Sequence, residues 1–156
     1  MNFNQQIAKH FRNVHFGGNW TSVNLNDLLK DVTWQQATTK VSNINTIATL
    51  TYHVHYFVHE VLKVLNGGEL EAHDKYSFDH PPINSQDDWD RFLERVFADA
   101  KEFADLVEQL PDDKFFEDFT DAKYGNYYGN IVGITEHTHY HLGQIAVIKK
   151  MLNNAA

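Results

Sequence analysis

The sequence predicts an all-α protein, a four-helix bundle with long crossover connections. Four long segments place apolar residues three and four positions apart, which is the spacing of an amphipathic helix. Few segments show the alternation of a β-strand, and no internal repeat is present. The 156 residues suffice for a substantial core, so we assign residues 1–156 to a single domain.

The first helix is expected over Phe3–Phe16, where apolar residues gather on one side. The pair Gly17-Gly18 follows and supplies the backbone freedom that a helix end commonly uses. Two short helical segments are then expected at Asn24–Lys30 and Thr33–Lys40, with Thr33 as the N-cap of the second.

The second long helix is expected from Ser42 or Asn43 to Asn66, and the third from Ser85 to Leu110. The Ser85 hydroxyl suits an N-cap, and acidic residues follow it at the positive end of the helix dipole. The fourth helix is expected over Tyr127–Leu152. The apolar residues that keep helical register in the second and fourth helices are Ile44, Ile47, Leu50, Val54, Val58, Val61, Leu65, Tyr127, Ile131, Ile134, Leu142, Ile145, Ile148 and Leu152.

The connections between the helices carry several large side chains. We expect Trp20 and Trp34 to cover one end of the core, where an indole can bury its rings while its N–H finds a partner. The segment Gly67–Ser85 is longer than compact domains usually tolerate, so we expect it to pack over the bundle. The sequence leaves open whether this segment lines a pocket. Residues 112–126 form an acidic, aromatic connector whose carboxylates are expected to face solvent.

Three histidines fall within five residues of the fourth helix. At about 100° per residue, His137 and His141 point into the apolar stripe one turn apart, and His139 points toward solvent. A buried imidazole needs partners for two ring nitrogens, which leucine and isoleucine neighbours cannot supply. A structural histidine that is satisfied elsewhere is one interpretation. A divalent metal ion shared by the two rings is the other, and it requires a third ligand from elsewhere in the fold.

The second long helix carries histidines at positions 53, 55 and 59. His55 and His59 are four residues apart, but His59 lies well round toward solvent, so this pair is interpreted as a poor metal site. His53 and His55 flank the centre of the apolar stripe by similar angles. Periodicity therefore does not decide which of these two supplies an inward ligand.

Composition excludes several classes of function. The 21 acidic residues outnumber the 13 basic ones, for a net charge of −8, and no basic stripe is present, so nucleic-acid binding is not expected. No segment reaches the roughly 18 uncharged apolar residues of a membrane span, and the N-terminal residues lack signal-peptide features, so we expect a cytoplasmic protein. The absence of cysteine excludes disulfides and thiolate ligands. Aromatic-rich helices often leave an apolar face to cover, which favours a homodimer.

Two segments carry a family resemblance. Thr51–Phe57 (TYHVHYF) and His137–Ile145 (HTHYHLGQI) resemble the second-helix histidine segment and the C-terminal HxxxH-Gly-Gln of the DinB-like superfamily. This superfamily comprises metal-binding four-helix bundles and includes bacillithiol transferase-like proteins. Asp74–Asp79 and Pro81-Pro82 are similar to one uncharacterised branch of it. The resemblance covers nearly the whole chain and implies one DinB-like domain.

The resemblance also implies a site. It implies His53, rather than His55, as the third metal ligand beside His137 and His141, with nickel or zinc as the ion and positions left open to water or substrate. Such a site fits a metal-dependent enzyme of the thiol transferase or hydrolase type, with a low-molecular-weight thiol as co-substrate in the first case. The alternative is a non-catalytic metal-binding bundle with a structural, stress-response or sensing role.

The sequence identifies no catalytic acid or base. Tyr56 and Glu60 follow His53 on the second helix, and each either assists a bound ligand or is an ordinary packing or surface residue. Gln144 is expected to orient a metal ligand, and Gly143 to let another helix approach closely. A ferritin-like di-metal site is rejected, because it needs two inward Glu-x-x-His motifs and this chain offers only one.

Overall fold

The computed structural model describes residues 1–155, and this range is folded entirely into helices and their connections. It contains no β-strand, only an isolated bridge between Asp118 and Asn126, so the predicted all-α class is confirmed. None of the described helices combines the length and apolarity needed to cross a membrane. The helices are α1 (Phe3–Phe16), α2 (Leu25–Leu29), α3 (Trp34–Thr38), α4 (Ile47–Leu65), α5 (Gln86–Gln109) and α6 (Tyr127–Ala155), with short 3₁₀ helices at Asp74–Tyr76, Asp112–Phe116 and Ala122–Tyr124.

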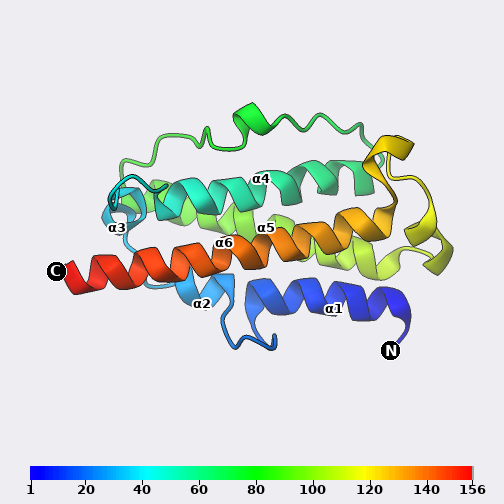
Figure 1. The fold of residues 1–156 in the computed structure, drawn as a ribbon, viewed down its shortest axis with the longest axis horizontal. Coiled ribbons are helices and arrows are strands. Elements are labelled where there is room, and N and C mark those ends of the chain that lie inside the picture. Colours follow the sequence, from blue (N-terminus) through cyan, green and yellow to red (C-terminus); the bar gives the residue numbers. More distant parts are fainter. Residues whose placement is uncertain (156) are drawn as a thin grey trace.

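The long helices lie lengthwise against one another. α4 and α6 are side by side and run in opposite directions, with α5 behind them and α1 packed against α5 and α6 (Figure 1). Because α4 and α5 run in the same direction, the chain must return along the length of the molecule between them. Residues 66–85, green in Figure 1, make this return, which accounts for their unusual length.

Backbone conformation moves one predicted boundary. The Thr46 hydroxyl accepts a hydrogen bond from the backbone N–H three residues later, so α4 begins at Ile47 rather than at Ser42 or Asn43. Ser42 has a φ of 53°, a left-handed conformation that a right-handed helix cannot include. Ile44, which was expected in the apolar stripe, therefore lies outside the helix and is 43% exposed.

The other long helices keep close to their expected bounds. The Ser85 hydroxyl accepts a hydrogen bond from the Asp88 backbone N–H at 3.1 Å, as expected of the N-cap of α5. α1 spans the predicted Phe3–Phe16, and α6 continues past the expected end at Leu152 to Ala155. In the connector after α5, the buried rings are Phe115 and Phe119, and the acidic side chains at positions 112, 113, 117 and 118 are exposed as predicted.

The expectation for the two tryptophans is half wrong. Trp34 packs against the apolar cluster formed by α2, α3 and the facing halves of α4, α5 and α6, but Trp20 is fully exposed. The preceding residue explains this outcome. The Asn19 side chain is buried and donates to the Val23 carbonyl at 2.6 Å, so the chain turns its amide inward at this point and the adjacent indole outward.

The buried apolar side chains form two clusters along the helices. In α6 the break between them falls between Ile134 and Leu142, and His137 and His141 occupy that interval. The buried apolar residues of α4 are divided between the two clusters in the same way, on either side of His53. A polar layer therefore separates two apolar halves of the molecule, and the candidate ligands lie in it.

Candidate metal centre

Three imidazoles meet between α4 and α6. The Nε2 atom of His137 lies 3.0 Å from Nε2 of His53 and 3.0 Å from Nε2 of His141. His137 and His141 share one side of α6, one turn apart, as their spacing predicts. The structure brings His53 to this cluster from α4 and turns His55 toward Asp99 of α5.

The other nitrogen of His53 defines its tautomer. Nδ1 of His53 lies 2.9 Å from the Ser77 hydroxyl oxygen. That hydroxyl donates its only hydrogen to the Asp74 carbonyl at 2.8 Å, so its oxygen accepts from His53. Nδ1 therefore carries the proton, and Nε2 presents a lone pair to the cluster.

His141 is oriented in the same way from its own helix. Its Nδ1 atom lies 2.7 Å from the side-chain carbonyl oxygen of Gln144, which can only accept a hydrogen bond. The predicted contact between Gln144 and a histidine of the cluster is thus present. The Gln144 amide group also donates to the Tyr140 hydroxyl at 3.3 Å, which holds the carboxamide in this orientation.

The two tautomers leave one lone pair without a hydrogen-bond partner in the cluster. Nε2 of His53 and Nε2 of His141 both face His137, whose Nε2 carries at most one hydrogen and can satisfy only one of them. A cation can accept all three lone pairs at once. Tetrahedral zinc with Zn–N bonds of about 2.0 Å would place the nitrogens about 3.3 Å apart, close to the spacing observed. The residues present therefore fit a divalent metal ion.

Burial keeps the three rings neutral, which is the form that binds a metal. Desolvation, followed by the neighbouring His141 and His53, lowers the pKa of His137 to about 4. Burial likewise lowers the pKa of His53, with a further contribution from His141, and it lowers the pKa of His141. His53 and His141 are each only 8% exposed.

The segment 66–85 covers this centre and supplies residues that the sequence analysis missed. Phe78 stacks on the His53 ring with centroids 4.0 Å apart, and the adjacent Ser77 is fully buried. Phe57 of α4 meets both His53 and His137 edge-on at 5.1 Å. The sign available in the sequence was that a small hydroxyl residue, Ser77, lies between two aromatic residues, Tyr76 and Phe78.

Two neighbouring residues have structural partners instead of contacts to the rings. The Tyr56 hydroxyl accepts from the backbone N–H of His73 at 2.8 Å and so anchors the covering segment to α4. Glu60 is buried and receives a hydrogen bond from Lys63 at 2.7 Å. Within residues 1–155, neither side chain hydrogen-bonds a histidine of the cluster.

The prediction that His139 faces solvent is wrong. His139 points away from the cluster, but it is half-buried, and its Nε2 lies 3.3 Å from the Asn19 amide. Its ring also lies 6.1 Å from that of His10 in α1. The physical reason is that α1 and the connector after it pack on this side of α6, which single-helix periodicity does not reveal.

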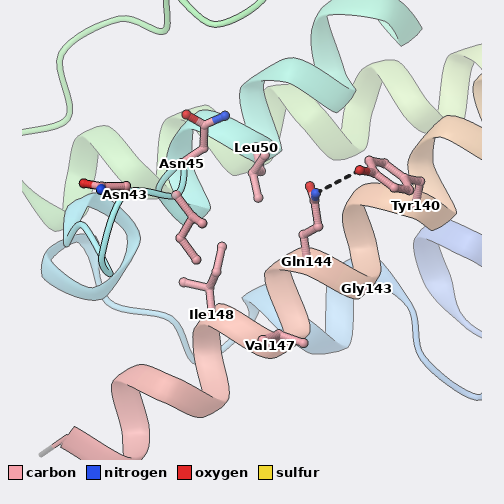
Figure 2. Close-up of a pocket in the computed structure, with 9 residues that line it drawn as sticks. Asn43, Asn45, Leu50, Tyr140, Gly143, Gln144, Val147 and Ile148 are labelled. Carbon is pink, nitrogen blue, oxygen red and sulfur yellow. Dashed lines mark hydrogen bonds between the residues drawn. The ribbon is translucent and has the colours of Figure 1, made fainter.

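A pocket of about 530 Å³ lies between α6 and the start of α4 (Figure 2). Gln144, which accepts a hydrogen bond from His141, is one of its lining residues and links it to the histidine cluster. Leu50 from α4 and Gln144 and Ile148 from α6 point into the pocket (Figure 2). Gly143 also lines it, and a Cβ built there meets nothing within 4 Å, so the expected close approach of a helix is wrong. The remaining lining residues are Asn43, Ile44, Asn45, Tyr140 and Val147, so none of the lining side chains is charged.

Comparisons of the chain with protein-family models, curated proteins and solved structures find no match.

Proposed function

We propose that this protein is a divalent-metal-binding, DinB-like four-helix bundle built from α1, α4, α5 and α6. We further propose that it is a metal-dependent enzyme of the thiol transferase or hydrolase type, with His53, His137 and His141 as the ligands. The observation that carries the proposal is the convergence of three Nε2 atoms. Those of His53 and His141 present lone pairs, because Ser77 and Gln144 accept hydrogen bonds from the Nδ1–H groups of the same two rings. Nickel and zinc suit a site of three imidazoles.

The chemistry divides between the ion and the chain. When bound by three neutral imidazoles, a divalent ion supplies Lewis acidity that lowers the pKa of a coordinated water or low-molecular-weight thiol. Ser77 and Gln144 hold the histidine rings so that their lone pairs stay aligned. Phe57 and Phe78 cover the His53 ring and exclude water from that side, which strengthens electrostatic interactions at the site.

The pocket beside Gln144 supports a particular kind of substrate. Its lining combines aliphatic side chains, such as Leu50 and Ile148, with the uncharged amides of Asn43 and Asn45. Placing a phosphate or carboxylate there would cost solvation without an ionic partner. We therefore infer that the substrate presents a neutral, largely apolar group with hydrogen-bonding atoms to this pocket.

A non-catalytic role is the second candidate. The cluster joins α4 to α6, and its His53 and His141 are only 8% exposed, which favours an ion that stabilises the fold or reports on its own availability. In that case removal of the ion would destabilise the chain strongly. The loaded site would also have no ligand that exchanges with a small molecule.

Turnover by the metal-loaded chain distinguishes the enzymatic role from the non-catalytic one. Apo-protein is reconstituted with Ni²⁺ or Zn²⁺ and assayed with a low-molecular-weight thiol plus an aryl halide, and separately with a p-nitrophenyl ester. We expect metal-dependent turnover in one assay, lost in His141→Ala and retained in His139→Ala. Turnover that survives His141→Ala would contradict the enzymatic proposal, and so would a loaded centre without an exchangeable ligand.

A further inference from the structure

A second group of metal-ligating side chains lies on another side of α4, against α5. The Nε2 atom of His55 and the Nδ1 atom of His59 each lie 2.8 Å from the same carboxylate oxygen, Oδ2 of Asp99. The three donor atoms are all within 4.8 Å of one another. His55 and His59 are four residues apart on α4, so one helix face presents both rings, and the carboxylate comes from α5.

This group is partly enclosed and not an exposed ion pair. The side chains of His55 and Asp99 are 12% and 20% exposed, and that of His59 is 47% exposed. One side of the group is therefore sheltered by the two helices, and the other is open to an incoming ion. Two imidazoles and one carboxylate form a donor set that binds zinc and non-haem iron in proteins.

The surroundings of the open side are strongly acidic. A hollow of about 600 Å³ adjoins the group and is lined by both His59 and Asp99. Its charged lining residues are Glu69, Glu71, Asp99 and Glu102, against the single ammonium group of Lys63. Four carboxylates facing one cation concentrate divalent cations at this point of the surface. Glu102 lies one turn from Asp99 on α5, where its carboxylate accepts a hydrogen bond from the Asn66 amide at 3.0 Å.

We propose that His55, His59 and Asp99 form a second divalent transition-metal site, separate from the three-histidine centre. The earlier interpretation of His55 and His59 as a poor site considered α4 alone. Asp99 supplies the missing ligand, because α5 packs directly on this face of α4. The site does not depend on the proposed enzymatic function.

Asp99→Asn separates metal binding from a simple hydrogen-bond network among the same atoms. Asparagine keeps a carbonyl oxygen that accepts from the imidazole N–H groups, so the packing of α4 on α5 is retained. It removes the negative charge, and a neutral amide oxygen is a much weaker ligand for zinc or cobalt than a carboxylate. His59→Gln is a second variant, at the most exposed of the three ligands.

The experiment counts metal ions bound per chain. Apo-protein is titrated with Zn²⁺ by calorimetry, bound zinc is measured after desalting, and Co²⁺ absorption reports the ligand set. We expect two equivalents for the wild type and for the control His10→Gln, which removes an exposed histidine from α1. We expect one equivalent for Asp99→Asn, for His59→Gln and for the double variant His137→Ala/His141→Ala. Circular dichroism checks that each variant is folded.

The outcomes separate the two sites. If the wild type binds one ion and Asp99→Asn binds none, the second site stands and the three-histidine proposal fails. If Asp99→Asn and His59→Gln bind as many ions as the wild type, the second site is refuted. It is refuted equally if the double variant His137→Ala/His141→Ala is folded and binds no zinc.

Discussion

The Nε2 atoms of His53 and His137 lie 3.0 Å apart, although 84 positions separate the two residues in the chain. The contact requires α4 and α6 to pack in one register, because a shift of one residue on either helix would rotate a ring out of the cluster by about 100°. The lone pairs on Nε2 of His53 and Nε2 of His141 both face His137, whose Nε2 carries at most one hydrogen, so at least one of the two lone pairs has no hydrogen-bond donor in the cluster. An arrangement that leaves polar atoms unsatisfied unless a cation is added is the physical basis of the metal proposal.

His141→Ala should remove one equivalent of bound metal, whereas His139→Ala should leave the stoichiometry unchanged. Both substitutions delete an imidazole from the same turn of α6, but only His141 has a nitrogen 3.0 Å from that of His137. Zinc analysis of desalted protein checks this. An equal loss in both variants would mean that the helical phase assigned to α6 is wrong.

Gln144→Leu should weaken metal binding at the three-histidine centre by about 10–100-fold without abolishing it. Leucine has a similar volume but cannot accept the Nδ1–H of His141, so the ring loses the bond that fixes its tautomer and orientation. Competition with a chromophoric chelator measures the dissociation constant. Gln109→Leu, an exposed glutamine near the end of α5, is the matched control and should bind metal like the wild type.

The helices could be predicted from the sequence because their determinants are local. Apolar stripes and capping residues such as Ser85 act within one or two turns, and they placed α1, α5 and the start of α6 closely. The start of α4 was missed because the left-handed backbone at Ser42 leaves no trace in apolar spacing. The parallel course of α4 and α5 is a tertiary property, and only the length of residues 66–85 hinted at it.

The site could be predicted only in part for a similar reason. The spacing of His137 and His141 shows that they share a helix face, but the choice of His53 over His55 required the DinB-like resemblance. Asp99 left a usable sign: it lies three residues after Val96 and four before Phe103, so it interrupts the apolar stripe of α5. Its contact with His55 spans 44 positions and could not be foreseen without the packing of the two helices.

Metal binding should raise the thermal stability of the chain. An ion that binds only the folded state at about 100 times its dissociation constant adds about 2.7 kcal/mol, which corresponds to about 5–10 °C in Tm for a chain of this size. Differential scanning fluorimetry with Zn²⁺ and then with excess chelator measures the shift. The variant His137→Ala/His141→Ala should show a smaller shift, and an undiminished one would place the stabilising ion elsewhere.

The chain should form a homodimer through an exposed stripe of α6 that also borders the pocket beside Gln144, so a partner chain would cover part of the opening of that pocket. Tyr140, Val147 and Met151 lie on one stripe of this helix and are 65%, 56% and 43% exposed, which leaves apolar surface in water. Val147→Glu should therefore convert the dimer to a monomer in light scattering coupled to gel filtration. Lys101→Glu introduces the same side chain on the exposed face of α5 and should remain dimeric. A wild-type chain that is monomeric at all concentrations contradicts the prediction.

His15 should make the metal-free chain less stable as the pH falls from about 6.5 to about 4. Its ring is buried against Phe11, and desolvation lowers the pKa of His15 to about 4, although its hydrogen bond to the Phe11 carbonyl opposes this. Between the two pKa values the unfolded chain binds a proton that the folded chain does not, so the free energy of unfolding falls with falling pH and levels off below about 4.

The full difference between the folded and unfolded pKa values of His15 corresponds to about 3 kcal/mol in the free energy of unfolding. Most of this stability should be lost by about pH 4.5. Urea unfolding at about pH 7 and about pH 4.5 measures this loss, with chelator present to keep the proposed metal sites empty. His15→Leu keeps a buried apolar side chain but has no titrating ring. Its free energy of unfolding should therefore change less between the two pH values than that of the wild type, and the difference should be most of the ~3 kcal/mol. His10→Leu removes an exposed imidazole from the same helix and should reproduce the wild-type difference. If His15→Leu and the wild type lose the same free energy, the loss arises from other groups and the buried-imidazole account of His15 is wrong.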